Sequence, residues 1–79
     1  MPWRIERKGA SLRIWVACPM NDWDLLFDEA LRQVEHEKDL GYIEMPTRIS
    51  GATRIDAEAL ELMRTVLAHI SGLEVRAVE

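Results

Sequence analysis

The sequence contains few residues of the types that bind metals or perform covalent catalysis. It has one cysteine, Cys18, and two histidines, His36 and His69, which lie far apart in the chain. One thiol cannot form an internal disulfide, and this spacing differs from that of structural zinc sites. We therefore interpret Cys18 as a small core residue and both histidines as surface residues. Since glycine-rich phosphate-binding patterns are also absent, we expect no metal site, no cofactor and no enzymatic activity.

The chain also lacks long hydrophobic runs and an excess of basic residues. No apolar segment approaches the ~20 residues that are needed to cross a bilayer. Arg4, Glu6, Arg7 and Lys8 interrupt the N-terminal segment, where a signal peptide would need an apolar stretch. We therefore expect a cytoplasmic protein without a membrane span. The net charge is −4, and because a nucleic-acid binder needs a basic face, we expect no nucleic-acid partner.

The apolar pattern predicts one domain that spans residues 1–79. Alternation with a period of two predicts strands over residues 3–9 and 11–18, which form a hairpin around Gly9, and over residues 42–49 and 73–78. Pro46 breaks the third of these, so we expect that strand to be short, bulged at Pro46 or exposed on that side. Helical periodicity predicts helices over residues 23–37 and 57–70. The order β-β-α-β-α-β indicates an α/β domain close to the α+β boundary, with a single mixed four-stranded sheet. Alternating strands leave one sheet face open, so we expect both helices on the other face.

The same periodicity predicts which side chains form the core. We expect Asn21 or Asp22 to cap the first helix. The buried stripes of the two helices are predicted to be Trp23, Phe27, Ala30, Leu31 and Val34 in the first, and Leu60, Met63, Leu67 and Ile70 in the second. Trp15 falls on the outer face of its strand, where it covers the open side of the sheet or marks a contact surface.

The junction between the third strand and the second helix has the most informative local sequence, "ISGATRIDAEAL", residues 49–60. Asp56 is predicted to be the N-cap residue of the helix, because its carboxylate can accept hydrogen bonds from the first free backbone N–H groups. Ile55 and Leu60 then have the spacing of a hydrophobic staple, which fixes the direction in which the chain enters the helix.

These twelve residues resemble the signature of STAS domains, the small modules of anti-sigma factor antagonists and sulfate transporter tails. The family pattern is approximately L-S-G-V-T-x-I-D-S-x-G-L, and the match runs without a gap from Ile49 to Leu60. The predicted order of strands and helices is also STAS-like. Two departures from the pattern within these residues matter for function. Ala57 stands where the family has a serine that kinases phosphorylate, and Ala59 stands where it has a glycine.

The resemblance implies a non-catalytic protein–protein interaction module that acts as a regulatory or accessory subunit, without phosphorylation control. Its partner would be an anti-sigma factor or related kinase-like protein, as for anti-sigma factor antagonists, or the ATPase of an ABC transporter. The residues that would contact the partner are Thr53, Arg54, Asp56, Ala57 and Glu58.

Two other interpretations stay open at this point. The first is a small acidic stand-alone inhibitor or decoy protein of mobile-element origin, which binds through its acidic surface and exposed aromatic residues such as Trp15. The second is a homodimer that forms through the open sheet face or an edge strand.

Overall fold

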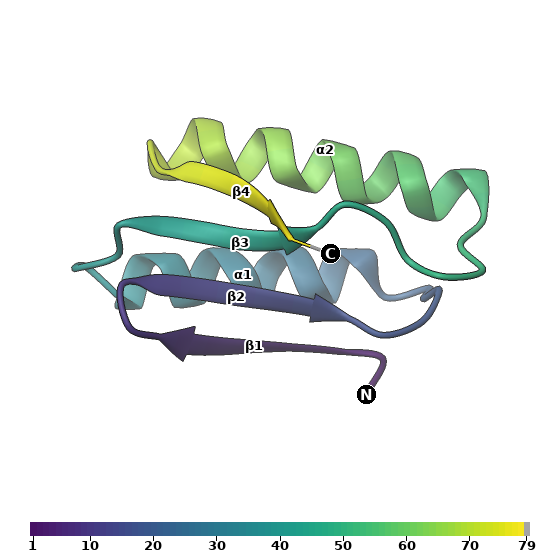
Figure 1. The fold of residues 1–79 in the computed structure, drawn as a ribbon, viewed down its shortest axis with the longest axis horizontal. Helices are drawn as coiled ribbons and strands as arrows, with labels where there is room; N and C mark the ends of the chain where they lie inside the picture. The colour runs from purple at the N-terminus through teal and green to yellow at the C-terminus, as the bar shows by residue number, and fades with distance from the viewer. Residues whose placement is uncertain (79) are drawn as a thin grey trace.

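The chain begins with a β-hairpin and continues with two strand–helix–strand units. In the computed structural model, which describes residues 1–78, β1 (Trp3–Lys8) and β2 (Ser11–Val16) are joined by a turn in which Gly9 has a positive φ of 58°. Then follow α1 (Trp23–His36), β3 (Tyr42–Pro46), α2 (Arg54–Ser71) and β4 (Glu74–Val78) (Figure 1). This confirms the predicted order β-β-α-β-α-β.

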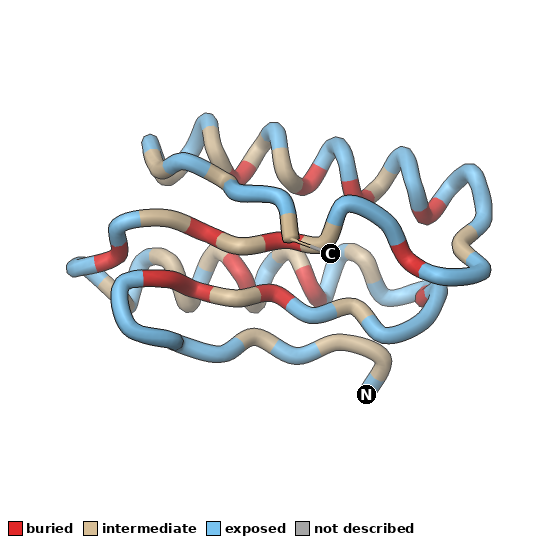
Figure 2. The backbone as a smooth tube through the Cα atoms, in the orientation of Figure 1, coloured by how far each residue is buried: buried red, intermediate tan, exposed pale blue. Residues whose placement is uncertain are grey.

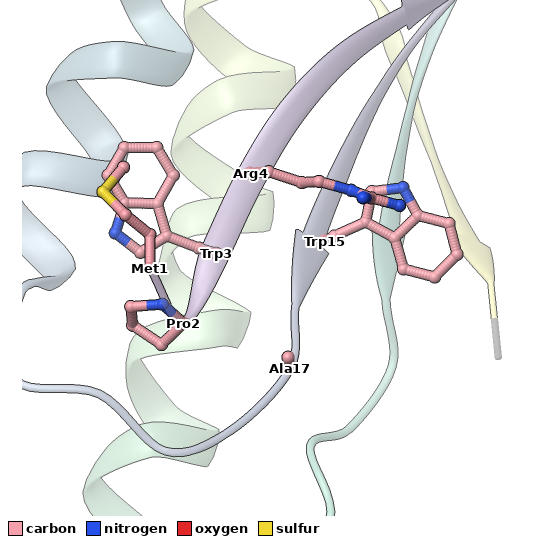
Figure 3. Close-up of a pocket in the computed structure, with 6 residues that line it drawn as sticks. All are labelled: Met1, Pro2, Trp3, Arg4, Trp15 and Ala17. Atoms are coloured by element: carbon pink, nitrogen blue, oxygen red, sulfur yellow. The ribbon is translucent and has the colours of Figure 1, made fainter.

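The four strands form one mixed sheet in the order β1-β2-β3-β4. β1 pairs antiparallel with β2, whereas β3 lies parallel to both β2 and β4. Each helix connects two neighbouring parallel strands, and right-handed connections of this kind place successive helices on the same face. Figure 3 shows both helices on one side of the sheet, with Trp3 turned toward them and Trp15 on the opposite side. The predicted mixed sheet with one open face is therefore present.

The hydrophobic core lies between the helices and the two central strands (Figure 2). Leu12 and Ile14 of β2 and Ile43 and Met45 of β3 are almost completely buried, as expected for central strands that have a helix layer on one face. The helices contribute Leu26, Ala30, Leu60, Met63 and Leu67.

The predicted helix faces were correct in period but not at every residue. Leu26, which the predicted stripe of α1 omitted, is fully buried beside Ala30. Ile70 was predicted to be in the core but is 57% exposed. Ile70 lies in the last turn of α2, so its burial depends on what the chain places beyond the helix. Asp22 is the N-cap residue of α1, although its side chain forms no capping hydrogen bond.

β2 and β3 end two and three residues before the predicted ranges do, and for β3 the position is the proline that was expected to break the strand. β2 ends at Val16, so Cys18 lies in the following loop and is exposed, and its assignment to the core was wrong. β3 ends at Pro46, because proline has no backbone N–H with which to extend the ladder. The chain beyond it forms a loop in which Ile49 is buried.

The open face of the sheet is covered by paired charges and stacked arginines. One row crosses all four strands and alternates in sign, from Glu6 through Arg13 and Glu44 to Arg76. Above this row the guanidinium carbons of Arg4 and Arg13 each lie 5.3 Å from the centre of the Trp15 ring, and the indole Nε1 of Trp15 donates to Glu6. Trp15 therefore covers the open side of the sheet, one of the two roles predicted for it.

No helix within residues 1–78 is both long enough and apolar enough to span a membrane.

Adjacent leucines of α1 provide a test of the core. Leu26→Ala should lower the free energy of unfolding by about 2–5 kcal/mol, because the site is fully enclosed and the lost methyl groups leave a cavity. Leu25→Ala should change it by less than about 0.5 kcal/mol, since that side chain is 61% exposed. Urea denaturation of both variants measures the difference, and equal losses would show that α1 packs with a different face.

Candidate functional site

The start of α2 is held by a reciprocal pair of hydrogen bonds between Thr53 and Asp56. The Thr53 hydroxyl accepts from the backbone N–H of Asp56, and the Asp56 carboxylate accepts from the backbone N–H of Thr53, both at 3.2 Å. This is a capping box with Thr53 as the N-cap residue. The prediction that Asp56 is the N-cap residue was therefore wrong. The helix begins at Arg54, three residues before the predicted start. With Thr53 as the cap and an acid at the third helical position, two backbone N–H groups gain hydrogen-bond acceptors instead of one.

The earlier start also removes the predicted hydrophobic staple. Ile55 is inside the first turn of α2 and is 75% exposed, whereas Leu60 is 2% exposed and faces the core. Residues five positions apart point in directions that differ by about 140° on a helix, so the two side chains cannot pack together. Ile55 instead becomes an apolar side chain on the surface.

Asp56 connects the starts of the two helices. Its Oδ1 accepts a hydrogen bond of 3.0 Å from the indole Nε1 of Trp23, the first residue of α1, while its Oδ2 accepts from Thr53. Asp56 is only 5% exposed. The hydrogen bond from Trp23 and those from Thr53 favour the charged carboxylate, so they hold the pKa of Asp56 below its usual value.

The five residues predicted to contact a partner lie together at this end of α2, but they do not all face solvent. Thr53, Arg54, Ala57 and Glu58 are exposed, and Asp56 is turned inward toward Trp23. The Arg54 side chain is 91% exposed, and its Nε lies 3.0 Å from Oε1 of Glu58 one turn later. The exposed surface of the first turn of α2 thus consists of Arg54, Ile55, Ala57 and Glu58; sequence reasoning assigned Ile55 to a staple and so missed it.

Residues that could bind a metal or a small substrate were sought next. Within residues 1–78, no group of three or more His, Cys, Asp or Glu side chains could hold a metal ion. A hollow beside the N-terminal segment is lined by Met1, Pro2, Trp3, Arg4, Trp15 and Ala17 (Figure 3). Arg4 is the only ionisable side chain in this lining, so the hollow offers no acid–base pair.

Comparison with known proteins found no family model, no curated protein and no solved structure that matches the chain.

The Asp56 carboxylate should make stability depend on pH. Its pKa is lowered in the folded state, so its stabilising contribution is present at neutral pH and is lost as pH falls below about 4, the ordinary value for aspartate. Asp56→Asn should therefore lower the melting temperature at pH 7 by about 4–8 °C. The difference from the unaltered protein should shrink at pH 3.

Glu61→Gln is the matched control, since Glu61 is exposed and its side chain forms no ion pair within residues 1–78. Thermal melting at both pH values measures the effect. A difference for Asp56→Asn that is the same at pH 3 and pH 7 would contradict the assignment.

Proposed function

We propose that this chain is a non-catalytic, STAS-like protein–protein interaction module that acts as a cytoplasmic regulatory or accessory subunit. The proposal is supported by the resemblance of residues 49–60 to the STAS signature and by an order of elements that agrees with that family. The observation that carries it is the rigid presentation of the first turn of α2. Its exposed residues stand on a backbone that the capping box and the Asp56–Trp23 hydrogen bond fix in place. A surface that is already ordered loses little conformational entropy when it binds.

The chemistry of this turn favours a partner that offers a carboxylate beside an apolar patch. Ile55 and Ala57 supply apolar surface, and Arg54 can form a bidentate pair with a carboxylate. The present ion pair between Arg54 and Glu58 is solvent-exposed, and such pairs contribute little to stability. A partner carboxylate can therefore replace Glu58 at small cost.

Ala57 determines the kind of control that this surface can have. A methyl group stands at the position of the family's phosphorylated serine, so no phosphate can be attached there. Binding would then depend on the amount of each protein rather than on a kinase acting at this position. The partners that we propose are an anti-sigma factor or related kinase-like protein, or the ATPase of a transporter.

The surroundings of Trp15 favour this proposal over the inhibitor or decoy interpretation, which depends on exposed aromatic residues. Arg4 and Arg13 stack on the Trp15 ring, and Glu6 accepts its N–H. A partner that used Trp15 as an aromatic anchor would have to displace these groups.

The test is co-purification of the tagged protein with its partners from the source cell. Arg54→Glu and Ala57→Glu should each reduce recovery of specific partners by about tenfold, the loss expected when a central contact is replaced by a charge. Arg32→Glu is the control, because Arg32 is an exposed arginine of α1 that is likewise paired with a glutamate, Glu29. Recovery of the same partners in the same amounts by all variants would show that this turn is not the contact surface.

A further inference from the structure

An apolar groove runs between the two helices. Its apolar lining is Trp23 and Phe27 of α1 and Ala59, Leu62, Met63 and Val66 of α2, and its volume is about 350 Å³. Leu62 is 65% exposed although it lies in this lining. Trp23, Phe27 and Val66 are half-buried, so Leu62 is the apolar side chain of the lining that the groove leaves most open to solvent.

On α2, the groove residues Ala59, Leu62 and Val66 belong to a surface stripe that begins at Ile55, outside the groove. Ile55, Ala59, Leu62 and Val66 follow one another at intervals of four, three and four residues, which places them on one side of the helix. They extend along about 16 Å of the helix axis. Leu60, Met63 and Leu67 face the sheet, so α2 has a second apolar face next to its buried one.

The α1 side of the groove has an acidic rim. Asp24 lines the groove, and Asp28 and Glu35 lie on the same side of α1 at helical spacing. All three residues are exposed, and none forms an ion pair with any residue from 1 to 78. Asp24 and Asp28 are like charges four residues apart, and such pairs lower the stability of a helix. A cationic partner would relieve this repulsion.

We propose that this groove binds an amphipathic helix of a partner protein, with an apolar stripe flanked by Lys or Arg on the side that faces α1. A helix that inserts apolar residues into a groove between helices is a recurrent mode of recognition. The charge of the rim selects the sign of the flanking residues and speeds the encounter. The lining of the groove does not include Arg54, Ile55, Ala57 or Glu58, so the inference does not require the first turn of α2 to be a contact surface.

The acidic rim also argues against two other occupants. In a symmetric dimer the groove of one copy would face the same groove of the other, and the two rims would repel each other. An anionic membrane surface would be repelled for the same reason.

The test uses two synthetic helical peptides of about 18 residues. Both have leucines at positions i, i+4, i+7 and i+11, and their flanking residues are lysine in one and glutamate in the other. Titration into the intact protein, followed by fluorescence anisotropy of a labelled peptide, should give an affinity about tenfold higher for the lysine peptide at low salt. This preference should decrease as salt screens the charges.

Variants of the protein locate the binding site. Leu62→Glu should abolish binding of the lysine peptide, and the double variant Asp28→Lys, Glu35→Lys should reverse the preference between the peptides. Ala57→Glu should bind as the unaltered protein does, which separates failure of this inference from failure of the proposed function. Glu61→Lys is the charge control on the opposite side of α2. All of these side chains are exposed, and circular dichroism checks that each variant is folded.

Three results would overturn the inference. The first is equal affinity for the two peptides, and the second is binding of the lysine peptide that Leu62→Glu leaves unchanged. The third is a dimer in sedimentation velocity that Leu62→Glu converts to a monomer, because a second copy would then occupy the groove.

Discussion

The hydrogen bonds of Asp56 connect the N-terminal ends of the two helices, and both candidate binding surfaces lie at or beside this connection. One carboxylate accepts from the indole of Trp23 at the start of α1 and from Thr53 at the start of α2. The helices lie side by side on the same face of the sheet, and this carboxylate fixes the distance between their N-terminal ends. It therefore sets the width of the groove at that end and the position of the exposed first turn of α2. A buried charge of this kind is tolerated because several donors surround it.

The charges of the protein are arranged differently on its two faces. On the open sheet face, acids and arginines alternate from strand to strand and neutralise one another. On the helix side, α1 has four carboxylates and a single arginine, Arg32. The net charge of −4 therefore belongs chiefly to the helices. The two faces are consequently suited to different neighbours. The charged row on the sheet face is balanced within itself, and the helix face attracts cations.

Element order and sheet composition could be predicted because they depend on local periodicity. Alternation identified the strands, and spacing of three and four residues identified both helices. The cap of α2 could not be decided in this way, since Thr53 and Asp56 are both good cap residues. In the structure Thr53 is the N-cap residue of a capping box, and Asp56 also accepts a hydrogen bond from Trp23, which lies 33 residues away in the sequence. Cys18 and Ile70 were misplaced for a related reason, because burial near the end of an element depends on what lies beyond it.

The candidate site, too, could be predicted from local sequence only in part. The sequence predicted Thr53, Arg54, Ala57 and Glu58 as contact residues, and in the structure they lie together on the surface. The spacing of Asp24, Asp28 and Glu35 was also available in the sequence, but its meaning depends on the apolar groove beside it. Trp23 belongs to both regions, since its ring lines the groove while its N–H holds Asp56. A ligand that bound in the groove and held the Trp23 ring in place would therefore favour the charged form of Asp56. By reciprocity, protonation of Asp56 at low pH would weaken the binding of that ligand.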